Sequence, residues 1–166
     1  MSSCIIQFAG IHNDFDLLSQ EEKERIKKLE SFDNVNKKFI YEIHAKQLLQ
    51  ELATHEKSLV YIFTNGCKSE YCLPISSVER FAEDNDYKLF LIMNGYNNLD
   101  ETTSQQVSNP LFSINSEYYG SSKKKEYLIA FRKELGYYNL SKDDKLPNSY
   151  MFFTKDSLVE IKRSIE

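Results

Sequence analysis

Apolar residues along the chain gather in short runs that alternate with polar or amphipathic stretches. The runs at 39–43, 58–64 and 87–93 are mostly apolar, which is typical of strands covered on both faces of a sheet. The stretch between the first two runs places Leu48, Leu49 and Leu52 on one helical face. This alternation of strand and helix predicts an α/β fold in which parallel strands are joined by right-handed crossovers.

Capping signals indicate where helices begin. Ser19 and Glu22 have the spacing of a capping box, and we expect the helix that they open to run to about Phe32. Ser76 and Glu79 repeat this spacing and predict the start of a second helix. The pattern also predicts a polar, turn-rich segment at 94–109 with a short helix, a strand at 110–114, a helix at 121–136, and a hairpin of strands 148–154 and 158–162.

The order of these elements predicts one mixed sheet flanked by helices. Strands joined by crossovers run parallel, whereas a terminal hairpin adds antiparallel strands at one side. We therefore expect the strands that begin near Phe39, Ser58 and Tyr87 to share one sheet with the hairpin 149–162.

Composition fits an ordinary globular protein. The chain has 166 residues, of which 41% are hydrophobic and 28% are charged. We assign residues 1–36 to an N-terminal extension with a peripheral helix and residues 37–166 to the α/β domain. With a net charge of −4 and no basic cluster beyond Lys123–Lys125, we expect no nucleic-acid partner. No apolar stretch reaches the ~20 residues of a membrane span, and we expect a monomer.

The N-terminal sequence "MSSC" has two interpretations. It lacks the basic and apolar regions of a signal peptide, which favours a cytoplasmic protein. Small residues directly before Cys4 also resemble the end of a bacterial lipoprotein signal. In that case Cys4 carries a lipid anchor and the protein resides in the bacterial cell envelope or periplasm. Otherwise Cys4 belongs to a short apolar strand, "CIIQFAG".

Cys67 and Cys72 are the main candidates for chemistry. The stretch "YIFTNGCKSEYCLP" places them five positions apart, just after the strand 58–64. Chemistry in open α/β sheets collects at the carboxyl ends of the strands, and the N-terminus of a following helix would stabilise a Cys67 thiolate. The pair is a redox pair, a metal clip, or two small hydrophobic residues that happen to be close.

Two further uses of these residues fit less well. A structural zinc site needs four ligands, and the three histidines show no ligand spacing, so we expect neither a metal nor another cofactor. The stretch from Thr64 to Cys67 is similar to the end of the peroxiredoxin pattern, in which a hydroxyl positions peroxide beside a thiolate. That pattern has a proline where this chain has Val60, and no partner arginine can be assigned.

Taken together, the element order and two landmarks resemble the thioredoxin superfamily over about residues 38–162. "SLVYIFTNGC" resembles the strand that leads to the first active-site cysteine, and "KLPNSYMFFTKDSLVEI" resembles the proline, strand, turn and last strand of that fold. The resemblance implies that Cys67 attacks and that Cys72 resolves the mixed disulfide. It also implies a cis bond between Leu146 and Pro147, which helps to bind substrate proteins through their thiols or disulfides.

The chain departs from this family in three places. The usual spacing is C-x-x-C, whereas here four residues separate the cysteines. In a regular helix this spacing gives ~7.5 Å of rise, but a disulfide needs Cα atoms within ~7 Å, so a bridge requires residues 68–71 to form a loop. Gly66 replaces the usual Trp, and the C-terminal helix is missing or very short. The sequence therefore predicts either a thiol–disulfide oxidoreductase or a redox-inactive thioredoxin-like binding module.

Overall fold

The structure is a computed structural model that describes residues 10–69, 72–140 and 149–165. Cys4, Leu146 and Pro147 lie outside the described residues, so the lipidation and cis-proline expectations remain predictions.

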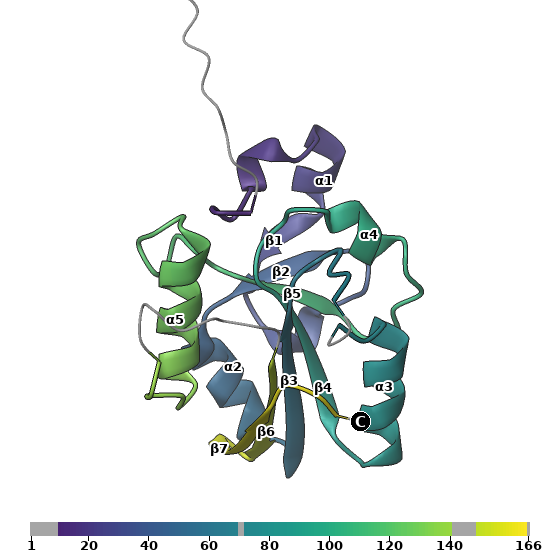
Figure 1. The fold of residues 1–166 in the computed structure, drawn as a ribbon, viewed down its shortest axis with the longest axis vertical. Coiled ribbons are helices and arrows are strands. Elements are labelled where there is room, and N and C mark those ends of the chain that lie inside the picture. The colour runs from purple at the N-terminus through teal and green to yellow at the C-terminus, as the bar shows by residue number, and fades with distance from the viewer. Residues whose placement is uncertain (1–9, 70–71, 141–148, 166) are drawn as a thin grey trace, which may run out of the picture.

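A mixed sheet of seven strands forms the centre of the described structure (Figure 1). The strands are β1 (Ile26–Lys28), β2 (Ile40–Ile43), β3 (Lys57–Phe63), β4 (Lys88–Met93), β5 (Leu111–Ile114), β6 (Ser149–Thr154) and β7 (Ser157–Lys162). Their order is β1-β2-β5-β4-β3-β6-β7, in which the first five are parallel and the β6–β7 hairpin is antiparallel. The predicted α/β class and the shared mixed sheet are confirmed.

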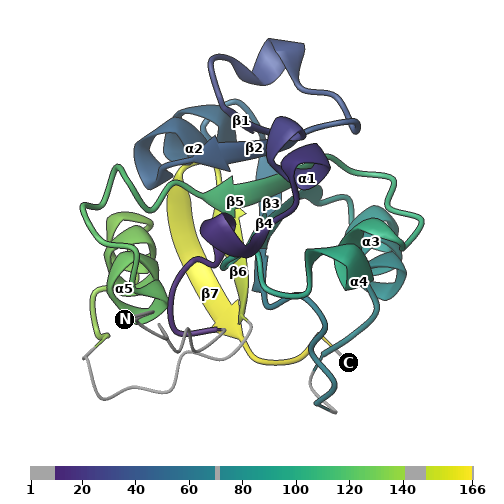
Figure 2. The same ribbon diagram turned by 90° about the horizontal axis from the view of Figure 1, so that it is seen from above.

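Helices cover both faces of this sheet. The α-helices of the described residues are α1 (Gln20–Glu24), α2 (Ala45–Leu52), α3 (Ile75–Asp84), α4 (Leu99–Thr103) and α5 (Lys124–Glu134), of which α2 to α5 cover the faces. Figure 2 shows α2 and α5 on one face, and α3 and α4 on the other. Each face has its own hydrophobic core. Val60 and Ile62 of β3 pack into the core on the α2 and α5 side, whereas Leu59, Tyr61 and Phe63 pack into the core on the α3 and α4 side. Because successive residues of a strand face opposite sides, burial of both faces explains why this stretch is continuously apolar.

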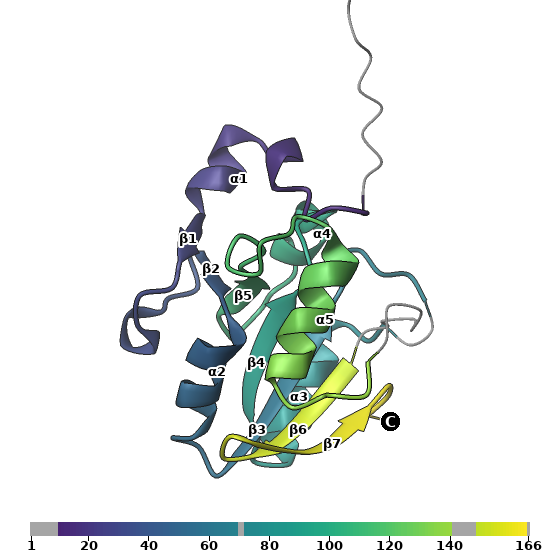
Figure 3. The ribbon, with the colours of Figure 1, turned by 90° about the vertical axis from the view of Figure 1, so that its left-hand side faces the viewer.

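The N-terminal helix is shorter than predicted. The capping box at Ser19 is present, but α1 ends at Glu24, and β1 follows almost at once in parallel pairing with β2. This pairing lets Leu29 and Phe32 pack against the core on the α2 and α5 side. Ile26, Leu29 and Phe32 have the spacing of one helical face, but they belong to an edge strand and to the turn that follows it. Figure 3 shows α1 beyond the end of the sheet, away from α2.

The second predicted capping box is wrong. Pro74 is the N-cap of α3 and makes no side-chain cap, so Ser76 lies inside the helix. Glu79 has a different role, because its Oε1 accepts hydrogen bonds from the backbone N–H groups of Ser108 (2.7 Å) and Asn109 (2.8 Å). The carboxylate therefore ties α3 to the segment that enters β5, a long-range contact that local spacing does not reveal.

Candidate functional site

Cys67 comes soon after the end of β3, an interior strand of the sheet. Phe63 ends β3 beside Met93, the last residue of β4, and β6 begins on the other side of β3. The chain then turns through Gly66, whose φ of +63° lies in the left-handed region that glycine adopts without strain. Cys67 thus lies at the carboxyl edge of the parallel strands, as predicted, where open α/β sheets collect their chemistry.

Cys67 and Cys72 form a disulfide, with their Cα atoms 5.9 Å apart. Residues 67–69 and 72–74 are not helical, and α3 begins only at Ile75. The prediction that a bridge needs a non-helical loop is therefore confirmed in the described part of this loop. The sequence suggested that β3 leads directly into a helix at Cys67. Instead, a loop separates Cys67 from the first turn of α3.

The Ser69 hydroxyl lies beside both sulfur atoms of the disulfide. Both cysteines are half-buried. The Oγ atom of Ser69 lies 3.6 Å from the Sγ of Cys67 and 3.2 Å from the Sγ of Cys72. Because a disulfide sulfur carries no proton, the hydroxyl is the donor in either contact. The bridge is thus reachable from solvent and has a hydrogen-bond donor beside both sulfurs.

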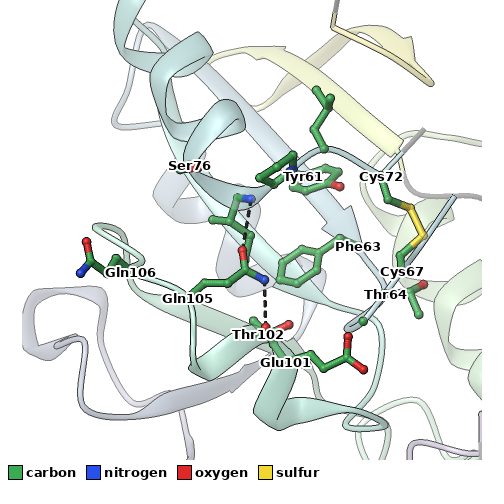
Figure 4. Close-up of a pocket in the computed structure, with 14 residues that line it drawn as sticks. Tyr61, Phe63, Thr64, Cys67, Cys72, Ser76, Glu101, Thr102, Gln105 and Gln106 are labelled. Atoms are coloured by element: carbon green, nitrogen blue, oxygen red, sulfur yellow. Dashed lines mark hydrogen bonds between the residues drawn. A yellow bond between two sulfur atoms is a disulfide. The ribbon is translucent and has the colours of Figure 1, made fainter. Parts of the chain in front are cut away.

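A pocket of about 630 Å³ opens beside the disulfide (Figure 4). Tyr61, Phe63 and Leu73 give it an apolar side, and both cysteines line it. α4 and the residues after it form the opposite, polar side, which includes Glu101 and Gln105. Its volume falls within the ~300–1,000 Å³ of typical ligand sites. The disulfide therefore borders a cavity large enough to receive part of another molecule.

Asn65 joins the cysteine loop to the polar wall of this pocket. Its side chain is 3% exposed. Its Nδ2 donates to the carbonyl oxygen of Gly95 (2.9 Å), and its Oδ1 accepts from the hydroxyl of Thr102 (2.7 Å). Beside it, the Nδ2 of Asn94 donates to the Oγ1 of Thr64 (2.7 Å). Sequence reasoning missed these roles, although the polar pair "TN" directly after a buried strand was a signal for them.

Gln105 holds the two helices of this face together. Its Oε1 accepts from the backbone N–H of Ile75 (3.4 Å), at the start of α3, and its Nε2 donates to the carbonyl oxygen of Glu101 (3.0 Å) in α4. The dashed lines in Figure 4 mark these two bonds. One side chain thus satisfies a backbone donor that the start of a helix leaves open and fixes the position of the pocket wall.

Glu101 is the one charged side chain among the described residues that line the pocket. Its carboxylate packs against Gly66, where an added Cβ would lie 2.9 Å from both Cδ and Oε2. Figure 4 shows the carboxylate turned toward the loop that carries Cys67. Glycine at position 66 therefore serves both the left-handed turn and the close approach of this carboxylate.

A second polar cluster lies farther along the same sheet edge. The Tyr96 hydroxyl donates to Oε1 of Glu42 (2.9 Å) and lies 2.7 Å from the Oγ of Ser113. Burial raises the pKa of the Glu42 carboxyl and raises the pKa of the Tyr96 hydroxyl well above its usual range. None of these residues lines the disulfide pocket. No local pattern indicates this cluster, because its members come from β2, from β5 and from the segment after β4.

Three other kinds of site, a metal centre, a membrane span and a peroxiredoxin-type centre, can be compared with the same described residues. Within 10–69, 72–140 and 149–165, no three His, Cys, Asp or Glu side chains come together as a metal-ligand set. None of the helices in these ranges is both long and apolar enough to cross a membrane. The peroxiredoxin pattern would place a hydroxyl and an arginine beside the thiol. Thr64 does line the pocket with Cys67, but no arginine is among its described lining residues.

No protein-family model, curated protein or solved structure matches this chain. The α/β class, the mixed sheet and the disulfide are therefore established by the structure alone. The likeness to the thioredoxin superfamily remains a resemblance in sequence landmarks and element order.

Proposed function

We propose that the protein is a thioredoxin-like thiol–disulfide oxidoreductase whose redox centre is the Cys67–Cys72 disulfide. The observation that carries this proposal is the position of the bridge. It is half-buried beyond the carboxyl end of the interior strand β3 and lines a pocket. These are the features that thiol–disulfide exchange requires, because an attacking thiolate must reach a sulfur along an open path.

The alternative is a bridge that only stabilises the fold, but a bridge of this kind contributes little stability. The disulfide joins residues five positions apart. Closing so short a loop stabilises the native state by only about 2 kcal/mol in the chain-entropy account, less than bridges that close long loops. The bridge also lies outside both hydrophobic cores. Exchange chemistry therefore explains the pair better than stapling does.

The proposed reaction moves two electrons between the protein and a substrate dithiol. A substrate thiolate attacks the Sγ of Cys67, the Cys67–Cys72 bond breaks, and Cys72 leaves as a thiolate that takes a proton from water. The second substrate thiolate then attacks the substrate sulfur of the mixed disulfide, which releases Cys67 as a thiolate. The substrate becomes a disulfide and the protein a dithiol. The same steps in reverse reduce a substrate disulfide.

A redox titration tests this proposal. The Cys4→Ser protein, which leaves only the pair, is equilibrated with glutathione or dithiothreitol buffers. Exchange is quenched with acid, the free thiols are then alkylated in denaturant near neutral pH, and the products are weighed by mass spectrometry. We expect one two-thiol transition with a midpoint above about −300 mV, because structural disulfides typically lie below that value. A pair that stays oxidised in every buffer until the protein unfolds would exclude redox activity. The second candidate function, a redox-inactive thioredoxin-like binding module, would then stand.

A further inference from the structure

The pocket beside the disulfide has two chemically distinct sides. The side formed by β3 and the residues before α3 is apolar, with Phe63 and Leu73 among its lining residues. The opposite side is formed by α4 and contributes amide, hydroxyl and carboxylate groups (Figure 4). A substrate segment whose cysteine reaches Cys67 must place its neighbouring side chains between these two sides.

The charge of the polar side comes from Glu101. Its neighbour Gln105 uses both ends of its amide within the protein, on Ile75 and on the backbone of Glu101 itself. In contrast, the carboxylate of Glu101 makes no hydrogen bond or ion pair with any residue that the structure describes. Glu101 is exposed to solvent, so it can pair with a cation on a bound segment, with the modest energy of a surface ion pair.

This carboxylate lies against the loop that carries the reacting cysteine. It packs against the backbone of Gly66, the residue before Cys67. α4, which carries it, is held by the bond from Thr102 to the buried Asn65. A carboxylate at this place favours a cation near the reacting sulfur and disfavours an anion.

Given the proposed function, on which this inference rests, we propose that the pocket selects cysteine-containing segments with a basic residue next to the reacting cysteine. The cation of a substrate Lys or Arg pairs with Glu101, while an adjoining apolar side chain packs against Phe63 and Leu73. Glu101 is then the specificity-determining residue of the site. Segments with an acidic residue at the same place are disfavoured, since two carboxylates would share the pocket.

The test measures how fast the oxidised protein reacts with short cysteine peptides. Three peptides differ only in the residue beside the cysteine, which is Lys, Gln or Glu. Each peptide thiolate attacks Cys67, forms a mixed disulfide and releases the Cys72 thiolate, and the second-order rate constant is recorded. Taking the Lys-to-Glu ratio of rate constants for each variant, and comparing variants, cancels the intrinsic reactivity of the peptides.

We expect the wild-type protein to favour the Lys peptide over the Glu peptide, and Glu101→Gln to lower that ratio roughly fivefold, the upper range for one exposed ion pair. Added salt should lower the wild-type ratio toward that of Glu101→Gln. Asp100→Asn is the matched control: it removes the same charge from α4, but Asp100 does not line the pocket. It should leave the ratio unchanged.

The outcomes separate this inference from the proposed function. If the wild-type protein reacts with none of the three peptides, the proposed function itself fails. If it reacts with all three but the ratio is the same in Glu101→Gln, only the inference about Glu101 is overturned. An equal fall of the ratio in Asp100→Asn would also overturn it, because the effect would then come from net charge rather than from the pocket.

Discussion

Replacing Cys72 by Ser should turn the protein into a trap for its substrate, and replacing Cys67 should abolish exchange. Without Cys72, a thiolate at Cys67 still attacks a substrate disulfide, but no resolving thiol remains, so the mixed disulfide persists. Without Cys67 the attacking group is lost, and turnover should fall to the uncatalysed rate. Mass spectrometry of the adduct after digestion, together with a disulfide-reduction assay, measures both effects.

Cys4→Ser is the control, since it removes the third cysteine but leaves the pair. It should keep full turnover and form no adduct. An adduct found on Cys72 in Cys67→Ser, with turnover retained, would reverse the assigned roles. Unchanged turnover in both single variants would mean that the pair is structural.

Replacing Asn65 by Ala should destabilise the protein by about 2–4 kcal/mol, because two buried hydrogen bonds are lost together and their partners are left unsatisfied. These partners are the Gly95 carbonyl and the Thr102 hydroxyl. Urea unfolding of the oxidised protein measures the change. Since Asn65 joins the cysteine loop to α4, the same change should also loosen one wall of the pocket.

Thr102→Val is the matched variant, because it removes only one of the two bonds and keeps the size of the side chain. It should cost about 1–2 kcal/mol. If Asn65→Ala costs less than ~0.5 kcal/mol, the range of an ordinary surface substitution, then the loop is not held as described.

The core strands and the loop between the cysteines could be predicted because their causes are local. In β3, five consecutive apolar residues, 59–63, are buried on alternating faces. Burial on both faces requires apolar residues at every position, so the sequence shows an unbroken apolar run. For the cysteines, helix geometry alone required a loop between Cys67 and Cys72 if they were bridged. The disulfide is present, and the described residues beside it, 67–69 and 72–74, are not helical.

The N-terminal region could not be predicted in this way. Its apolar residues have helical spacing, but pairing of β1 with β2 decides their structure. The partners, Ile26 and Ile40, are well separated in sequence, and no local signal specifies such a pairing. A correct capping box at Ser19 therefore opened a helix that ends after five residues.

The polar wall of the pocket was missed for a related reason. The segment 94–109 is polar and without periodicity, so the sequence indicated only turns and a short helix. Its position depends on single long-range contacts, such as those of Thr102 with Asn65 and of Gln105 with Ile75. Glu101 therefore had no feature in the sequence that set it apart from other surface carboxylates.

The most direct test of the central claim is the rate at which dithiothreitol reduces the Cys67–Cys72 disulfide in the folded Cys4→Ser protein. The reference is an oxidised peptide of residues 66–73, which carries the same loop without the fold. An exchange-competent fold exposes one sulfur and stabilises the departing thiolate, so reduction should be faster in the protein than in the peptide. Slower reduction in the folded protein would show that the fold shields the bridge, and would contradict its assignment as a redox centre.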